Sequence, residues 1–238
     1  MARRATIRTW ALVGLLAQVV FVAGWLLAGL WQGPGYDPVR HTISDMYAVG
    51  APNGLFLVVV LTLCGLGTVL FALLGLRPAL RGSGWAGIVG PVLLALSILG
   101  VGDLLSPFER QACRLADPGC TSAAQVANAG GGLDSMLSSI GLALLVTAGF
   151  VLAAAMGRLP GWRGLVLGTR VGSGVLVVLL LAALFVPGAS GLIERLLAAA
   201  AAAGVAVLAA ATHRRAAQAV PTAVIGASRP SAAGAAAG

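Results

Sequence analysis

The chain has 238 residues, of which 59% are hydrophobic and 9% are charged, and its mean hydropathy is +0.98. Soluble domains carry about a quarter charged residues, so this composition excludes a soluble globular protein and indicates a membrane protein. The formal net charge is +8, and all 15 cationic residues are arginines. These arginines lie between long apolar runs and form no basic face, which excludes a nucleic-acid partner.

A bilayer core of about 30 Å needs roughly 20 apolar residues per helix, because each residue rises about 1.5 Å. We therefore expect an all-α, polytopic six-helix transmembrane bundle within residues 10–212. The six expected spans are 10–31, 54–76, 85–105, 133–156, 165–186 and 192–212. Residues 1–9 form a basic flank before the bundle, and residues 213–238 are expected to be a disordered tail, because alanine, glycine, proline and serine dominate them.

The arginines predict the orientation, because positive charge in short loops stays on the cytoplasmic side. With six spans, one side carries the eleven arginines 3, 4, 8, 77, 81, 158, 163, 170, 214, 215 and 229, and the other side carries the four arginines 40, 110, 114 and 195. Both termini are therefore expected in the cytoplasm, in a multi-pass protein of the cell (plasma) membrane. All seven carboxylates fall on the outer side, which this rule does not require, so they indicate a separate role for that side.

The first outer loop, residues 33–47, carries more polar side chains than a connector needs. Thr42 and Asp45 match a capping box, and the apolar residues between and after them share one face, so we expect a short interfacial helix. Two interpretations remain open. Asp45 only caps this helix and His41 only faces lipid head groups, or His41, Ser44 and Asp45 form the roof of a site above the helix ends.

The outer helix ends supply further candidates. Asp134 opens the fourth span, where the helix dipole favours a carboxylate, so simple capping is one interpretation. Asp103 ends the third span, where the dipole disfavours an anion, and Arg110 and Arg195 are available as partners. We expect Arg195 to be the partner, because the sixth span begins with Glu194 and Arg195 on the side where the third span ends. The expected outer cluster comprises His41, Asp45, Asp103, Asp134, Glu194 and Arg195.

Cys113 and Cys120 lie seven positions apart in the third loop of the chain, which is the second loop on the outer side, and Pro118 and Gly119 stand just before the second cysteine. A turn here can bring the sulfur atoms together in an oxidising compartment, which predicts a disulfide. The alternative is two free thiols in a flexible loop. Cys64, inside the second span, is interpreted as ordinary packing.

Small residues at helical spacing, such as Gly168 and Gly172, allow close approach between transmembrane helices. They indicate either packing within one protomer or a homo-oligomer interface. Pro91 is expected to bend the third span, and Gly100 and Gly102 loosen its outer end.

Several classes of membrane protein are excluded by missing residues. The chain has no lysine for a retinal Schiff base, and neither His41 nor His213 lies in mid-span to ligate a haem. No ionisable residue lies near the middle of a span, which argues against pumps and secondary transporters. Hydrolase elbows, phosphate loops, paired histidines and CxxC pairs are also missing, so we expect no cofactor and no metal.

Two motifs resemble a known family. The first is Tyr36-Asp37-Pro38-Val39-Arg40-His41-Thr42-Ile43-Ser44-Asp45, followed by Ala51-Pro52-Asn53, and the second is Gly191-Leu192-Ile193-Glu194-Arg195-Leu196. In these stretches the chain resembles domain-of-unknown-function family 998, which consists of bacterial and archaeal six-helix integral membrane proteins. The resemblance extends over nearly the whole membrane region. It implies the topology and a shared outer polar site, and it implies no established reaction.

Two functions follow from these residues. The first is a lipid-embedded binding or accessory protein whose outer pocket recognises a lipid head group or a small polar ligand, or which supports a membrane-protein partner or envelope assembly. The second is a membrane enzyme acting on a lipid or isoprenoid substrate, with Asp45, Asp103, Asp134 or Glu194 as acid or base and His41 assisting. The first is favoured, because one histidine and scattered carboxylates form no recognised catalytic spacing.

Overall fold

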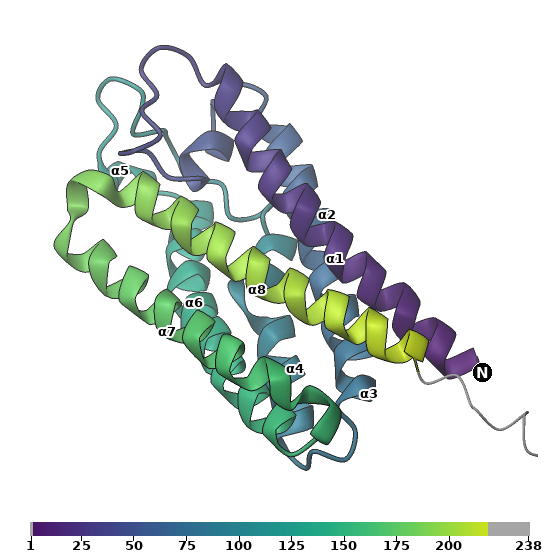
Figure 1. Ribbon diagram of the computed structural model, residues 1–238. Coiled ribbons are helices and arrows are strands. Elements are labelled where there is room, and N and C mark those ends of the chain that lie inside the picture. The colour runs from purple at the N-terminus through teal and green to yellow at the C-terminus, as the bar shows by residue number, and fades with distance from the viewer. Residues whose placement is uncertain (1, 219–238) are drawn as a thin grey trace, which may run out of the picture.

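The computed structural model describes residues 2–218, and within them the regular elements are all helices (Figure 1). Five helical stretches are long and apolar enough to cross a membrane: Arg4–Trp31, Gly54–Ala79, Ala129–Gly157, Pro160–Phe185 and Ser190–Gln218. A sixth apolar helix, α4 (Ala86–Leu96), is shorter. The chain is therefore a helical protein of the multi-pass membrane type.

Two connections between the elements are long, within residues 32–53 and 103–128, and the others are short. In chain order they are α1 (Ala2–Ala28), the 3-10 turn η1 (Gly29–Trp31), the 3-10 helix η2 (Ser44–Tyr47), α2 (Gly54–Leu70), the π-helical turn η3 (Phe71–Leu76), α3 (Arg77–Ala79), α4 (Ala86–Leu96), the π-helical turn η4 (Ile98–Gly102), α5 (Ser122–Gln125), α6 (Ala129–Gly157), the 3-10 helix η5 (Pro160–Leu165), α7 (Val166–Phe185), the 3-10 turn η6 (Pro187–Ala189) and α8 (Ser190–Gln218). Where the connection is short, two successive apolar helices pack antiparallel to each other.

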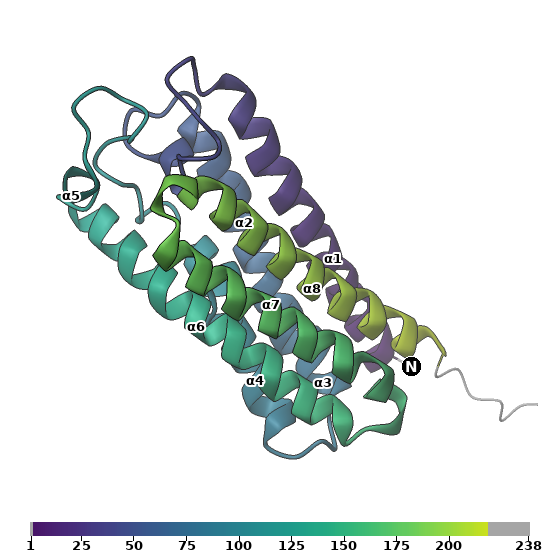
Figure 2. The ribbon, with the colours of Figure 1, turned by 60° about the vertical axis from the view of Figure 1, so that its left-hand side comes forward.

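The long helices form one bundle with two different ends (Figures 1 and 2). The beginning of α1 and the last turns of α8 lie together at one end, where the ring Nδ1 of His213 is 3.2 Å from the backbone oxygen of Arg8. We call this the terminal end. The loops 32–53 and 103–128 gather at the opposite end, which we call the loop end. All seven carboxylates of the chain lie at or near the loop end, in these loops and in the second turns of α6 and α8.

Glycines bring several helices into close contact within the chain. A Cβ on Gly90 would lie 2.8 Å from a side-chain carbon of Leu152 in α6, and one on Gly141 would lie 2.7 Å from the backbone nitrogen of Ile98. At these positions the small residue serves packing inside one protomer, as the first of the two interpretations holds. Gly168 and Gly172 on α7 differ, because a Cβ there would meet no atom within 4 Å.

The third expected span is not one continuous helix. Pro91 lies inside α4, and the break comes later, at Ser97, whose ψ of 175° is extended. The Ser97 hydroxyl donates to the Leu94 oxygen at 2.8 Å, so the side chain satisfies a carbonyl at the helix end, and the chain resumes as η4. The break lets the backbone at Ile98 pack against Gly141. It also leads directly into Asp103, which is only 8% exposed.

The first and the last helix are both longer than the spans expected from the sequence. Residues from Ala2 onward are helical, so most of the basic flank 1–9 is the first part of α1, and α8 continues past Thr212 to Gln218. The remainder of the expected tail, residues 219–238 with Arg229, lies outside the described residues.

The expected interfacial helix is the four-residue 3-10 helix η2. Its residues Asp45, Met46 and Tyr47 are buried, so polar and apolar side chains alike point into the protein. The segment is therefore a buried turn at the loop end and lacks the polar, water-facing side of an amphipathic surface helix.

Candidate ligand-binding cavity

The first loop lies directly on the beginning of α8. A Cβ on Gly191 would collide with the backbone oxygens of His41 and Pro38, so only glycine allows this approach. Arg195, one turn farther along, donates to the same two oxygens at 2.8 Å each. The residues of the two family-like motifs, far apart in the sequence, therefore form one contact.

The expected ion pair between Asp103 and Arg195 is wrong. The Arg195 guanidinium also donates to the Gly191 oxygen at 2.8 Å and to the Tyr36 hydroxyl, and its carbon lies 5.8 Å from the centre of the Tyr36 ring. Arg110 is used in the same way, because it donates to the backbone oxygens of Tyr47 and Ala48 at 2.9 and 3.0 Å. Both candidate cations, Arg110 and Arg195, donate their hydrogen bonds to backbone carbonyls, and each of them stabilises the first loop.

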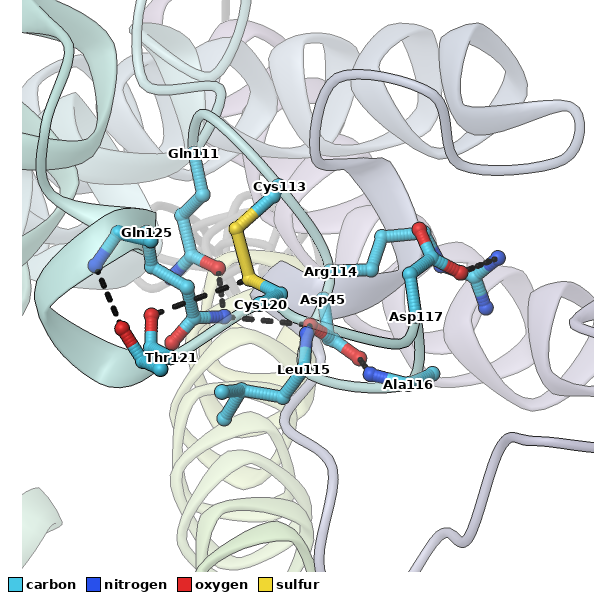
Figure 3. The surroundings of a disulfide bond; sticks show 11 residues. Asp45, Gln111, Cys113, Arg114, Leu115, Ala116, Asp117, Cys120, Thr121 and Gln125 are labelled. Carbon is cyan, nitrogen blue, oxygen red and sulfur yellow. Dashed lines mark hydrogen bonds and ion pairs between the residues drawn. A yellow bond between two sulfur atoms is a disulfide. The ribbon is translucent and has the colours of Figure 1, made fainter.

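Asp45 joins the first loop to the third (Figure 3). Its carboxylate is fully buried and accepts from the backbone N–H groups of Leu115 and Ala116, at 2.6 and 3.3 Å, and from the Gln125 amide at 3.2 Å. Burial raises the pKa of Asp45, and the two backbone N–H groups oppose that rise. The backbone N–H of Asp45 donates to the Thr42 hydroxyl at 3.3 Å, so the capping contact exists while the carboxylate serves the other loop.

The segment that binds Asp45 is closed by a disulfide. The sulfur atoms of Cys113 and Cys120 are bonded, and the loop between them presents the two N–H groups to Asp45 (Figure 3). Arg114 in the same loop is buried, donates to the Gln32 oxygen at 2.9 Å and lies 3.4 Å from the Asp117 carboxylate. The third loop is thus held by a covalent bond and by contacts to the segment that follows α1.

Beneath these loops lies a cavity of about 480 Å3, which we call the carboxylate cavity. Asp103, Glu109, Asp134 and Glu194 line it, and no arginine or histidine is among its described lining residues. Its inner wall is apolar and includes Leu99 from η4. Four acids from the third loop, from the chain after η4 and from two long helices therefore share one hollow with a polar and an apolar part.

Tyr47 lies close enough to all four acids of the cavity to interact with their charges. Burial raises the pKa of the Tyr47 phenol well above its usual value, and the nearby carboxylates raise it further. These carboxylates are those of Asp134, Glu109, Glu194 and Asp103. The phenol donates to Asp134 Oδ1 at 3.2 Å, so this tyrosine stays a neutral donor among the acids.

Two of the acids are held in place by hydrogen bonds. The Gln111 amide donates to Asp134 Oδ2 at 2.8 Å, and the Gln125 amide donates to Gln111 Oε1 at 2.7 Å as well as to Asp45. One chain of hydrogen bonds thus connects Asp45, through Gln125 and Gln111, to Asp134 in the cavity. Glu194 Oε2 accepts from the Ile43 backbone N–H at 2.9 Å.

The other two acids keep an oxygen without a partner. Asp103 Oδ2 and Glu109 Oε1 are buried and have no hydrogen-bond partner among the described residues. Glu109 is only 2% exposed. Burial, followed by the Asp134 charge, raises the pKa of Glu109 to about 8. Buried polar atoms in proteins are nearly always paired with protein groups, ordered water or a ligand, so these two oxygens retain capacity to accept a hydrogen bond.

The expected site residues fall into two sets. Ser44, Asp103, Asp134 and Glu194 line the carboxylate cavity. His41, Asp45 and Arg195 are not among its lining residues. Their side chains form hydrogen bonds with the backbone of the loops instead. The ring Nδ1 of His41 accepts the Asp37 backbone N–H at 2.9 Å.

Sequence reasoning missed several lining residues. Glu109 was only one of seven outer acids, and Tyr47, Gln111 and Gln125 were not expected in a site at all. A signal for α6 was available, because Ser135, Ser138 and Ser139 follow Asp134 at helical spacing and all line the cavity. No group of three or more His, Cys, Asp or Glu side chains in the described part of the chain is arranged to hold a metal ion.

The family model of DUF998, described as a protein of unknown function, matches residues 15–211. The match includes the first loop, the third loop, every carboxylate of the cavity and the beginning of α8. No curated protein and no solved structure matches the chain.

Proposed function

The chain belongs to the DUF998 family, and from the geometry of the carboxylate cavity we propose that it binds a membrane lipid through a protonated amine in the lipid head group. The observation that carries the proposal is the set of four acids around one cavity whose described lining has no cation, two of which, Asp103 and Glu109, each have a buried oxygen without a partner. A buried carboxylate is stable as an anion only beside a positive charge, so Glu109, whose pKa is raised to about 8, holds its proton at neutral pH and ionises when a cation binds next to it. An ammonium group supplies the positive charge and three donors.

The topology proposed with this function has six crossings. The beginning of α1 and the end of α8 lie at the same end of the bundle, which needs an even number of crossings. Five helices are long enough to cross, so α4 together with η4 supplies the sixth crossing. The terminal end carries most of the arginines and is assigned to the cytoplasm, which places the carboxylate cavity on the outer side of the plasma membrane.

A second candidate, an enzyme acting on a lipid or isoprenoid, is favoured by one observation. The pKa of Glu109 is raised to about 8, so this acid is protonated at neutral pH next to Asp134. A group with a pKa near the working pH suits general acid-base catalysis. Incubation with lipid extract followed by mass analysis distinguishes the two, because a binding protein returns the bound lipid unchanged and an enzyme releases a product of different mass.

The binding proposal is tested in nanodiscs of phosphatidylcholine that contain the full chain. Dodecylamine is titrated against the wild type, Asp103→Asn and Glu109→Gln, with Asp117→Asn as the matched control, because Asp117 is exposed and lies outside the cavity. A hydrogen bond to a charged group contributes about 1.5–3 kcal/mol, so each cavity variant should bind roughly 10- to 100-fold more weakly. The control should bind like the wild type.

Two results would overturn the proposal. Equal affinities of wild type and both cavity variants would show that the carboxylates do not contact the amine. Dodecanol binding as tightly as dodecylamine would replace the amine by a hydroxyl group as the recognised chemistry.

A further inference from the structure

A second cavity lies between α6, α7 and α8 and has a volume of about 340 Å3. We call it the apolar groove, because leucine, alanine, valine and glycine make up nearly all of its lining. Four of the lining residues are glycines at which a Cβ would meet no atom within 4 Å: Gly164, Gly168, Gly172 and Gly204. The groove exists because side chains are missing at these positions.

The apolar groove continues the carboxylate cavity. Leu145 on α6 and Ala201 on α8 line both hollows, so the two share part of their walls. Along α8 the combined path runs from Glu194 to Leu208. At about 1.5 Å per residue these positions are roughly 21 Å apart, and one leaflet of a bilayer core is about 15 Å thick.

We propose that the apolar groove holds the hydrocarbon chain of the same lipid whose amine head group lies in the carboxylate cavity. The inference rests on the proposed function and narrows its ligand to long-chain amine lipids. The polar part of the path is at the loop end, and the apolar part runs along the bundle toward the terminal end, where Gly164 and Leu165 line it. The path is longer than one leaflet, and its order of polar and apolar surface matches an extended long chain that is joined to a polar head group.

The continuity of the two hollows favours a hydrocarbon chain over a helix of another protein. The apolar groove shares wall residues with the carboxylate cavity, so one molecule with a polar head and an apolar chain can occupy both. The outer wall is α7, of which only Ser173 and Leu176 are buried, so this helix has the membrane on its other side. A lipid chain can therefore reach the groove from the bilayer beside α7.

The experiment uses two amines in phosphatidylcholine nanodiscs: butylamine, and dodecylamine with a diazirine at the end of its chain. Gly172→Leu and Gly204→Leu place a side chain in the groove. Gly174→Leu is the matched control, because Gly174 also has no atom within 4 Å of a Cβ but lies outside the groove lining on the same helix. Melting temperatures confirm that each variant folds, and either groove variant suffices if the other does not.

Light-induced adducts are expected on the groove segments of α6, α7 and α8 in the wild type and in Gly174→Leu. Loss of the contacts along a buried chain should lower the affinity ratio of dodecylamine to butylamine by about tenfold in the groove variants. Their adducts should decrease in parallel.

Failure of this inference differs from failure of the proposed function. Adducts that persist in both groove variants, or that fall only on the outside of the bundle, overturn the chain site while amine binding stands. A dimer that both groove variants dissociate, with adducts unchanged, assigns the groove to a second copy and also overturns it. Absence of butylamine binding to the wild type counts against the head-group site itself.

Discussion

Replacing Asp45 by alanine should detach the first loop from the third. In the native protein the buried carboxylate accepts three hydrogen bonds, from Leu115, Ala116 and Gln125. Asp45→Ala removes the acceptor of all three bonds, so the N–H groups of Leu115 and Ala116 lose their side-chain partner and the Gln125 amide keeps only Gln111. Asp45→Asn is the matched variant, because its single side-chain oxygen can still accept from Leu115.

The size of the effect follows from these bonds. An unpaired buried donor costs about 1–3 kcal/mol, and two of the three bonds are long, so Asp45→Ala should lower the free energy of unfolding by roughly 4 kcal/mol. For a chain of this size that corresponds to a decrease in melting temperature on the order of 10 °C. Asp45→Asn should cost about half as much, because it keeps the shortest bond.

The assay is tryptophan fluorescence during heating of the purified protein in detergent. The same measurement in a Cys113→Ser/Cys120→Ser background tests whether the disulfide presents the two N–H groups to Asp45. With the disulfide removed, Asp45→Ala should cost less than in the wild type, because its partners are already less ordered. A melting temperature of Asp45→Ala within 1 °C of wild type would refute the role of Asp45 in joining the two loops. Strictly additive costs would refute the coupling between Asp45 and the disulfide.

Three further predictions concern packing, pH and orientation. Gly191→Ala should destabilise the protein by about 1–3 kcal/mol because its Cβ meets backbone atoms, whereas Gly204→Ala on the same helix should not, and equal melting temperatures would contradict this. The folded protein holds the Glu109 proton up to about pH 8, whereas the unfolded chain loses it above about pH 4.5. The melting temperature of the wild type should therefore decrease as the pH is raised from 4.5 to 8. Glu109→Gln should remove that part of the slope, and an identical slope in the variant would exclude Glu109 as its source. A cysteine at Val126 should react with an impermeant maleimide on intact cells and one at Arg81 should not, and the reverse pattern would invert the topology.

Hydropathy along the chain was sufficient for the all-α, multi-pass class of the protein. Lipid as solvent demands long apolar helices, so composition alone indicated an all-α membrane protein, and the long helices of the structure fall on five of the expected spans. The concentration of all acids at the loop end was also visible in the sequence, because it depends only on which loop or helix end each residue occupies.

The partners of each polar side chain were decided by tertiary structure. Asp45 meets Leu115 across a sequence separation of 70, and Arg195 meets the carbonyls of the first loop across more than 150 positions. Matching opposite charges predicted a pair between Asp103 and Arg195. Backbone carbonyls also accept from a guanidinium, and the sequence does not show which carbonyls lie close to Arg195. The break at Ser97 and the open space at Gly172 have the same origin. Both features depend on how several helices pack against one another. The periodicity of apolar residues along one helix does not show which other helices will lie beside it.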